Sequence, residues 1–170
     1  LAHKCLLLVG LSGLGDEIRF SSAYPELIAA AGTCIITCEP RLHSLFRRSF
    51  PAARVLPASR DHIYHLGRRT SPDCVKIDQL AGVDYYTNSF RALEFIRPRA
   101  GSFAGHGACL VPDPALVKFW RENLASAFPG TVRVGLCWRS GINSYKRRRQ
   151  HFDLASLLQA FEGIDCTLIN

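Results

Sequence analysis

The feature that most constrains this chain is the segment from Gly10 to Asp16 (GLSGLGD), directly after the apolar run from Cys5 to Val9. A buried strand that ends in glycines and leads into a helical segment is the repeating unit of parallel α/β sheets. Such sheets bind ligands outside the carboxyl ends of their strands, where a helix start adds partial positive charge. Asp16 is therefore the first candidate for a catalytic residue. An alternative remains open, in which Asp16 only caps the helix and the glycines only form the turn.

Two familiar phosphate-binding motifs do not fit this segment. Gly10 and Gly15 have the spacing of a P-loop, but two acidic residues follow where Lys and Ser or Thr are required, and these would repel a phosphate. A dinucleotide fingerprint could start only at Gly13, and Ile18 then occupies the position of its third glycine. The segment thus favours neither a P-loop ATPase nor an NAD-binding protein.

Length and composition indicate a globular chain. Its 170 residues can bury one core, and 48% hydrophobic with 21% charged residues excludes a disordered protein. No apolar run reaches membrane-spanning length, so we expect no membrane span. The absence of methionine and the start at Leu1 predict a fragment or a processed form.

The seven cysteines favour a reducing, cytoplasmic location. Most lie in apolar strand-like runs, their number is odd, and no C-x-x-C pair occurs, which is typical of small buried side chains and not of disulfides. Cys34, Cys38 and His43 could form a metal site, but a fourth ligand is missing. We therefore expect no metal.

The net charge of +7 comes from arginine-rich blocks. Residues 41–69 hold seven arginines against the single acid Asp61, and residues 146–149 read KRRR. Such blocks bind the phosphates of nucleic acids, lipid headgroups or nucleotides. A solvated basic surface explains the scattered pairs of arginines within 41–69. It explains the four-residue run at 146–149 less well.

Apolar strands alternating with helical stretches predict a doubly wound, mostly parallel, Rossmann-like α/β sheet. We expect a helical stretch over 16–31, kinked or divided by Pro25, with Ile18, Phe20, Ala23, Leu27 and Ala30 on one side. Further helices are expected from Pro40, over 90–95, from Pro112 with a buried face, and over 153–161. The buried face of the helix from Pro112 is expected to carry Leu116, Phe119, Trp120, Leu124 and Phe128. Strands are expected at 4–10, 33–38, 54–56, 75–77, 132–138 and 166–169.

The chain divides, on this reading, into residues 1–130 and the opening of a second α/β unit at 131–170. An incomplete sheet leaves open edges, so residues 131–170 either pack onto the first domain or pair with another copy of the chain.

Motifs along nearly the whole chain resemble those of heptosyltransferase-like glycosyltransferases. The motifs that carry the resemblance are GLGDEIRF at 13–20, PEL at 25–27, CEPRL at 38–42, VPDP at 111–114, WR at 120–121, VGLCWRSG at 134–141, the arginines at 147–149 and LASLL at 154–158. The resemblance is closest to the relatives attached to tetratricopeptide-repeat proteins.

The resemblance implies a GT-B architecture, in which two Rossmann-like domains face each other across a cleft. It implies inverting, metal-independent transfer of a sugar from a nucleotide-sugar co-substrate, without a further cofactor, to a saccharide or protein acceptor. The first domain would take the acceptor and the second the donor. Because most of the donor domain is absent, we expect the 170-residue chain to be inactive by itself.

The resemblance also assigns roles to residues of this chain. Asp16 aligns with the catalytic base, with Gly13 and Gly15 in the acceptor-side loop. The donor-phosphate loop aligns with Trp138, Arg139, Ser140 and Gly141, and Lys146 and Arg149 are the cations that lie nearest in the sequence to the position of the family's donor-contacting lysine. The alternative function is a non-catalytic Rossmann-like module whose basic loops bind nucleic acid or other phosphate ligands.

Overall fold

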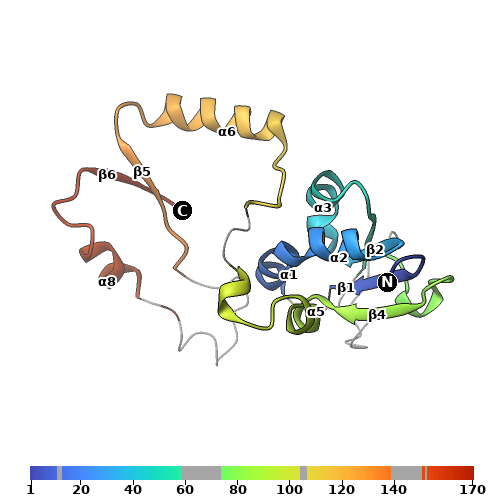
Figure 1. The fold of residues 1–170 in the computed structure, drawn as a ribbon. Coiled ribbons are helices and arrows are strands. Elements are labelled where there is room, and N and C mark those ends of the chain that lie inside the picture. The colour runs from blue at the N-terminus through green and yellow to red at the C-terminus, as the bar shows by residue number, and fades with distance from the viewer. Residues whose placement is uncertain (11–12, 59–73, 104–106, 139–150, 152) are drawn as a thin grey trace. The chain divides into compact units, whose positions relative to one another are not determined.

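The computed structural model describes residues 1–10, 13–58, 74–103, 107–138, 151 and 153–170. The chain forms two compact units, Leu1–Asp113 and Pro114–Asn170. Figure 1 shows the helices and strands of each unit. The division into domains at residue 130 stays a prediction.

The first unit is built on a four-stranded parallel sheet. Its strands are β1 (Cys5–Val9), β2 (Thr33–Cys38), β3 (Arg54–Pro57) and β4 (Tyr85–Asn88), in the order β3-β2-β1-β4. This order, and the helices that follow the strands, confirm a Rossmann-like α/β fold. The direction of strand addition reverses between β1 and β4, which is where open α/β sheets bind ligands.

The helices of this unit are short, and Pro25 divides the first helical stretch as predicted. Pro25 stands in the first turn of α2, where its missing N–H costs no helical hydrogen bond. The helical segments are α1 (Leu14–Phe20), η1 (Ser21–Ala23), α2 (Tyr24–Ala30), η2 (Pro40–Leu42), α3 (His43–Ser49), η3 (Ile77–Gln79), α5 (Ser89–Ile96) and η4 (Ala100–Phe103).

Both faces of β1 are buried, which explains its continuous apolar sequence. Leu6 and Leu8 pack in the main core with residues of α2, α3 and α5. Leu7 and Val9 face a smaller cluster that includes Ile77 of η3. Among the described residues of the first unit, the α-helices α2, α3 and α5 therefore cover one face of the sheet.

The expected strand at 75–77 is wrong, and a strand was missed. Val75 bonds to Pro57 O at 2.9 Å, but the segment then turns into η3. The sheet instead takes β4, whose Tyr85 and Tyr86 are largely exposed, so it lacks the apolar pattern of a buried strand. Asp84 fixes β4 beside β1 by accepting hydrogen bonds from Lys4 Nζ (3.0 Å) and Cys5 N (2.8 Å).

The second unit contains α6 (Pro114–Ala127), β5 (Val132–Gly135), α8 (Leu154–Gln159) and β6 (Cys166–Ile169). The strands β5 and β6 pair in parallel, so this unit holds a β-α-β arrangement, as predicted. The expected buried face of α6 is wrong for Leu116, Phe119 and Trp120, which are each more than half exposed.

No helix in the described ranges has the length and apolarity needed to cross a membrane.

Candidate functional site

The candidate site lies where the carboxyl ends of β1 and β2 approach each other. Gly10, the residue after β1, donates its N–H to Thr37 O at 3.0 Å. A Cβ atom on Gly10 would lie only 2.6 Å from that same oxygen. Glycine is therefore required at position 10 by the close approach of the two strands.

Asp16 is exposed in the first turn of α1. The N-cap position belongs to Gly13, whose carbonyl oxygen accepts the Glu17 N–H at 3.0 Å, so Asp16 does not hold the capping position of the alternative interpretation. A carboxylate in the first turn interacts favourably with the helix dipole. Asp16 is thus a solvent-facing carboxylate at the carboxyl edge of the sheet.

Glu17, the next residue, is completely buried. Its Oε2 atom accepts a hydrogen bond from the backbone N–H of Glu39 at 2.9 Å, directly after β2. The same carboxylate packs against Gly10, where an added Cβ would lie 2.9 Å from Glu17 Cδ. Glu17 therefore joins the first turn of α1 to the ends of both central strands.

The surroundings of Glu17 keep neighbouring groups protonated. Burial raises the pKa of the Cys38 thiol to about 12, and the carboxylates of Glu17 and Glu39 add to the shift. Burial likewise raises the pKa of Tyr24, with a smaller contribution from Glu17. These groups are therefore neutral near pH 7 and are poor candidates for a nucleophile or base.

Gly15 differs from Gly10 because nothing lies within 4 Å of the position its Cβ would take. Its φ angle is also one that other residues adopt readily. Neither packing nor backbone conformation in this structure requires glycine here. The missing side chain instead leaves open space beside Asp16, on the exposed side of the first turn.

The structure brings Gly13, Gly15 and Asp16 together, as expected from their sequence spacing. Trp138 is half-buried in the second unit, three residues after β5. The other predicted donor-side residues, Arg139, Ser140, Gly141, Lys146 and Arg149, lie outside the described residues.

Sequence reasoning missed Glu17. The signal was its place with Ser21 and Tyr24 on one stripe of i, i+4 and i+7 positions, and all three are buried. The expected stripe was partly wrong, since Ile18 and Ala30 are exposed, whereas Ala23 and Leu27 are buried as expected.

The described residues contain no group of three or more His, Cys, Asp or Glu side chains arranged to bind a metal ion. His43, which sequence reasoning considered as a ligand, places its Nε2 atom 3.2 Å from Val55 O.

Comparison with curated proteins gives a relative, Protein FlbA of Caulobacter vibrioides. The two are 36% identical over 155 residues, which is 88% of this chain and 25% of FlbA. This chain therefore spans about a quarter of the length of its relative. No protein-family model and no solved structure matches the chain.

Proposed function

We propose that the complete protein transfers a sugar from a nucleotide-sugar donor to an acceptor hydroxyl, as a heptosyltransferase-like glycosyltransferase of GT-B architecture. The observation that carries the proposal is the exposed Asp16 in the first turn of α1, the helix that follows β1, and β1 is one of the two strands between which the strand order reverses. This chain would supply the acceptor-side domain and the opening of the donor domain. Tetratricopeptide repeats upstream and a cytoplasmic location belong to the same proposal.

The chemistry requires a base at the acceptor. The acceptor oxygen forms a bond to the anomeric carbon as the bond from that carbon to the diphosphate oxygen breaks, which inverts the configuration. Asp16 takes the proton of the attacking hydroxyl, and the electron pair of the broken bond leaves with the nucleoside diphosphate. The open space beside Asp16, where Gly15 carries no side chain, supports access of an acceptor to this carboxylate.

The donor requires positive charge near its phosphates, because negative charge grows on the leaving diphosphate. The sequence offers Arg139, Lys146 and Arg149 after β5. Arginine is suited to bidentate contacts with phosphate oxygens, and no metal ion is needed where such cations offset the charge. The motif VGLCWRSG at 134–141 and the arginines at 147–149 support a donor site in this segment.

A binding experiment on the complete protein separates this function from the phosphate-binding alternative. Thermal unfolding is recorded with a panel of nucleotide sugars, and oligonucleotide binding is measured at two salt concentrations. Sugar transfer predicts that one donor raises Tm, since a ligand at about 100 times its Kd stabilises by about 2.7 kcal/mol. No response to any donor, together with oligonucleotide binding that falls steeply with salt, would favour the alternative.

A further inference from the structure

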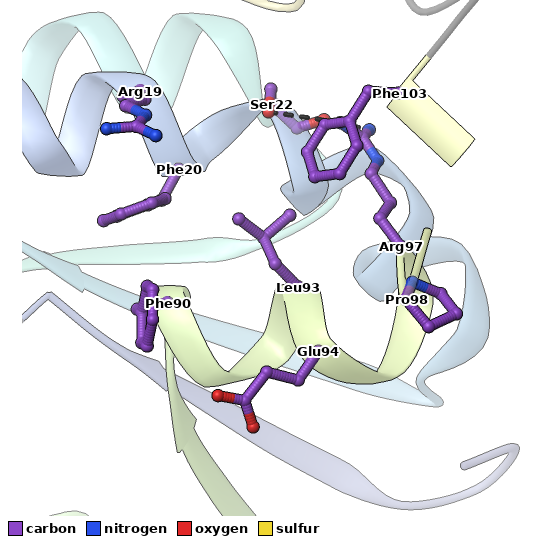
Figure 2. A pocket seen from close by; sticks show the side chains of 9 residues that line it. All are labelled: Arg19, Phe20, Ser22, Phe90, Leu93, Glu94, Arg97, Pro98 and Phe103. Carbon is purple, nitrogen blue, oxygen red and sulfur yellow. Dashed lines mark hydrogen bonds between the residues drawn. The ribbon is translucent and has the colours of Figure 1, made fainter. Parts of the chain in front are cut away.

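A cavity of about 600 Å³ lies between the end of α1 and the helix α5 (Figure 2). Pockets that bind organic ligands have volumes of about 300–1,000 Å³. Three phenylalanines from three elements line it: Phe20 of α1, Phe90 of α5 and Phe103 of η4. Figure 2 shows Leu93 between the Phe20–Phe90 pair and Phe103.

The phenylalanines give the cavity an apolar lining that remains open to solvent. Phe90 is 54% exposed and Phe103 is 48% exposed. The rings of Phe20 and Phe90 meet edge to face with their centroids 5.5 Å apart, the geometry that aromatic pairs prefer. A further aromatic ring could join this pair in the same geometry.

Arg97 forms a polar wall whose hydrogen bonds serve the fold. Its side chain is almost completely buried, and it donates to Glu26 Oε2 from Nε (3.0 Å) and from the NH2 nitrogen (2.7 Å). It also donates to the carbonyl and hydroxyl oxygens of Ser22. The guanidinium lies 5.4 Å from the centroid of the Phe103 ring and so supports that ring from one side.

Two charges of opposite sign stand at the rim, Arg19 of α1 and Glu94 of α5, and Glu94 also forms an exposed ion pair with Arg91 at 3.8 Å. Arg19 follows Asp16 by three residues, and side chains with this spacing are neighbours on a helix surface. The cavity therefore begins one helical turn from the candidate base.

These features select among ligand classes. A saccharide buries many hydroxyls, each of which needs a hydrogen-bond partner, whereas this lining is mainly apolar and Arg97 already bonds to Glu26 and Ser22. An anionic membrane surface requires a basic rim, and Glu94 opposes one. A polypeptide offers an apolar side chain for the aromatic lining and charged neighbours of both signs for Arg19 and Glu94.

We propose that this cavity binds an aromatic side chain of a polypeptide segment, with charged residues on either side of it paired to Arg19 and Glu94. The proposal does not depend on sugar transfer, because it concerns binding alone.

The test is an NMR titration of the 170-residue chain with the peptide Ac-Glu-Phe-Lys-NH₂. We expect its binding to perturb the resonances of Phe90 and Leu93, and we expect Ac-Glu-Ala-Lys-NH₂ to bind at least about tenfold more weakly, because it lacks the ring that the cavity buries. Methyl glucoside and vesicles of phosphatidylglycerol should leave these resonances unchanged. Failure of the phenylalanine peptide to bind, or equal binding of the alanine peptide, the glycoside or the vesicles, would overturn the proposal.

Matched variants locate the binding. Phe90→Ala and Phe103→Ala should each weaken peptide binding at least about tenfold. Phe95→Ala is the control, because Phe95 lies on the same helix as Phe90, is 78% exposed and is not part of the lining. Circular dichroism identifies any variant that does not fold, and Phe103 provides a second test on a separate element. Equal binding by the control and both cavity variants would contradict the assignment.

Discussion

The carboxylate of Glu17 accepts a hydrogen bond from the backbone N–H of Glu39 at 2.9 Å, which fixes the first turn of α1 against the end of β2. Adjacent residues on a helix point about 100° apart. With Glu17 directed into the core, Asp16 faces solvent at the edge of the sheet. The orientation of the candidate base therefore follows from the burial of its neighbour.

Two substitutions of Glu17 should separate the contributions of its size and hydrogen bond to stability from the contribution of its charge. In Glu17→Ala the Glu39 N–H loses its acceptor, which costs about 1–3 kcal/mol, and a cavity is left beside Gly10. In Glu17→Gln an amide oxygen can still accept, so we expect a smaller loss. Urea unfolding measures both. An alanine variant as stable as the original chain would show that the cost of burying the carboxylate cancels its hydrogen bond.

Substitution of Gly15 should affect the fold and the proposed reaction in opposite directions. Gly15→Ala meets no neighbour and replaces a glycine within α1, so we expect a gain in stability of about 0.5–1 kcal/mol. If an acceptor approaches this turn, the new methyl group should raise KM. Thermal unfolding and transfer kinetics on the complete protein measure the two effects. A variant with lower stability would contradict the open space seen beside Gly15.

The sequence predicted the centre of the sheet better than its edge. The runs that form β1 and β2 are apolar because both faces of those strands are buried, so composition alone identifies them. The edge strand β4 has exposed tyrosines and is held by the long-range contacts of Asp84, which no local pattern contains. The place of Asp16 at the start of a helix was predictable from the glycines before it, and its role as a base stays a prediction. The burial of Glu17 was harder to predict, although its spacing to Ser21 and Tyr24 was the signal, because a charged residue is expected on the exposed side of a helix.

The ion pair between Arg97 and Glu26 should contribute strongly to stability. The Arg97 side chain is 3% exposed, so Arg97→Ala should cost about 3 kcal/mol, at the lower end for buried pairs because Glu26 is one-third exposed and can be solvated. Arg91→Ala provides the control. Arg91 pairs with Glu94 at the exposed surface of α5, and loss of this ion pair should cost about 0–0.5 kcal/mol. Similar unfolding midpoints for the two variants would contradict this difference.

Stability should fall in alkaline solution because two thiols are buried. Burial raises the pKa of Cys34 and of Cys38 from 9.0 to about 12. Between these values the unfolded chain releases protons that the folded chain retains, so the free energy of unfolding decreases as pH rises from about 9 towards 12.

Urea midpoints at pH 8 and pH 10.5 measure this effect. The double variant Cys34→Ala, Cys38→Ala should show a smaller decrease of the urea midpoint. Part of the decrease should remain, because burial also raises the pKa of Tyr24. An unchanged midpoint in the original chain at pH 10.5 would contradict the prediction.

The role of Asp16 is tested most directly by comparing turnover and Tm of Asp16→Asn in the complete protein, with the donor found by the thermal-shift panel. Loss of a general base typically lowers the rate by about 10²–10⁴. Because Asp16 is exposed and Gly13 holds the N-cap position, we expect that loss of rate with Tm nearly unchanged. A variant that retains its turnover, whether or not it melts earlier, would contradict the assignment of Asp16 as the base.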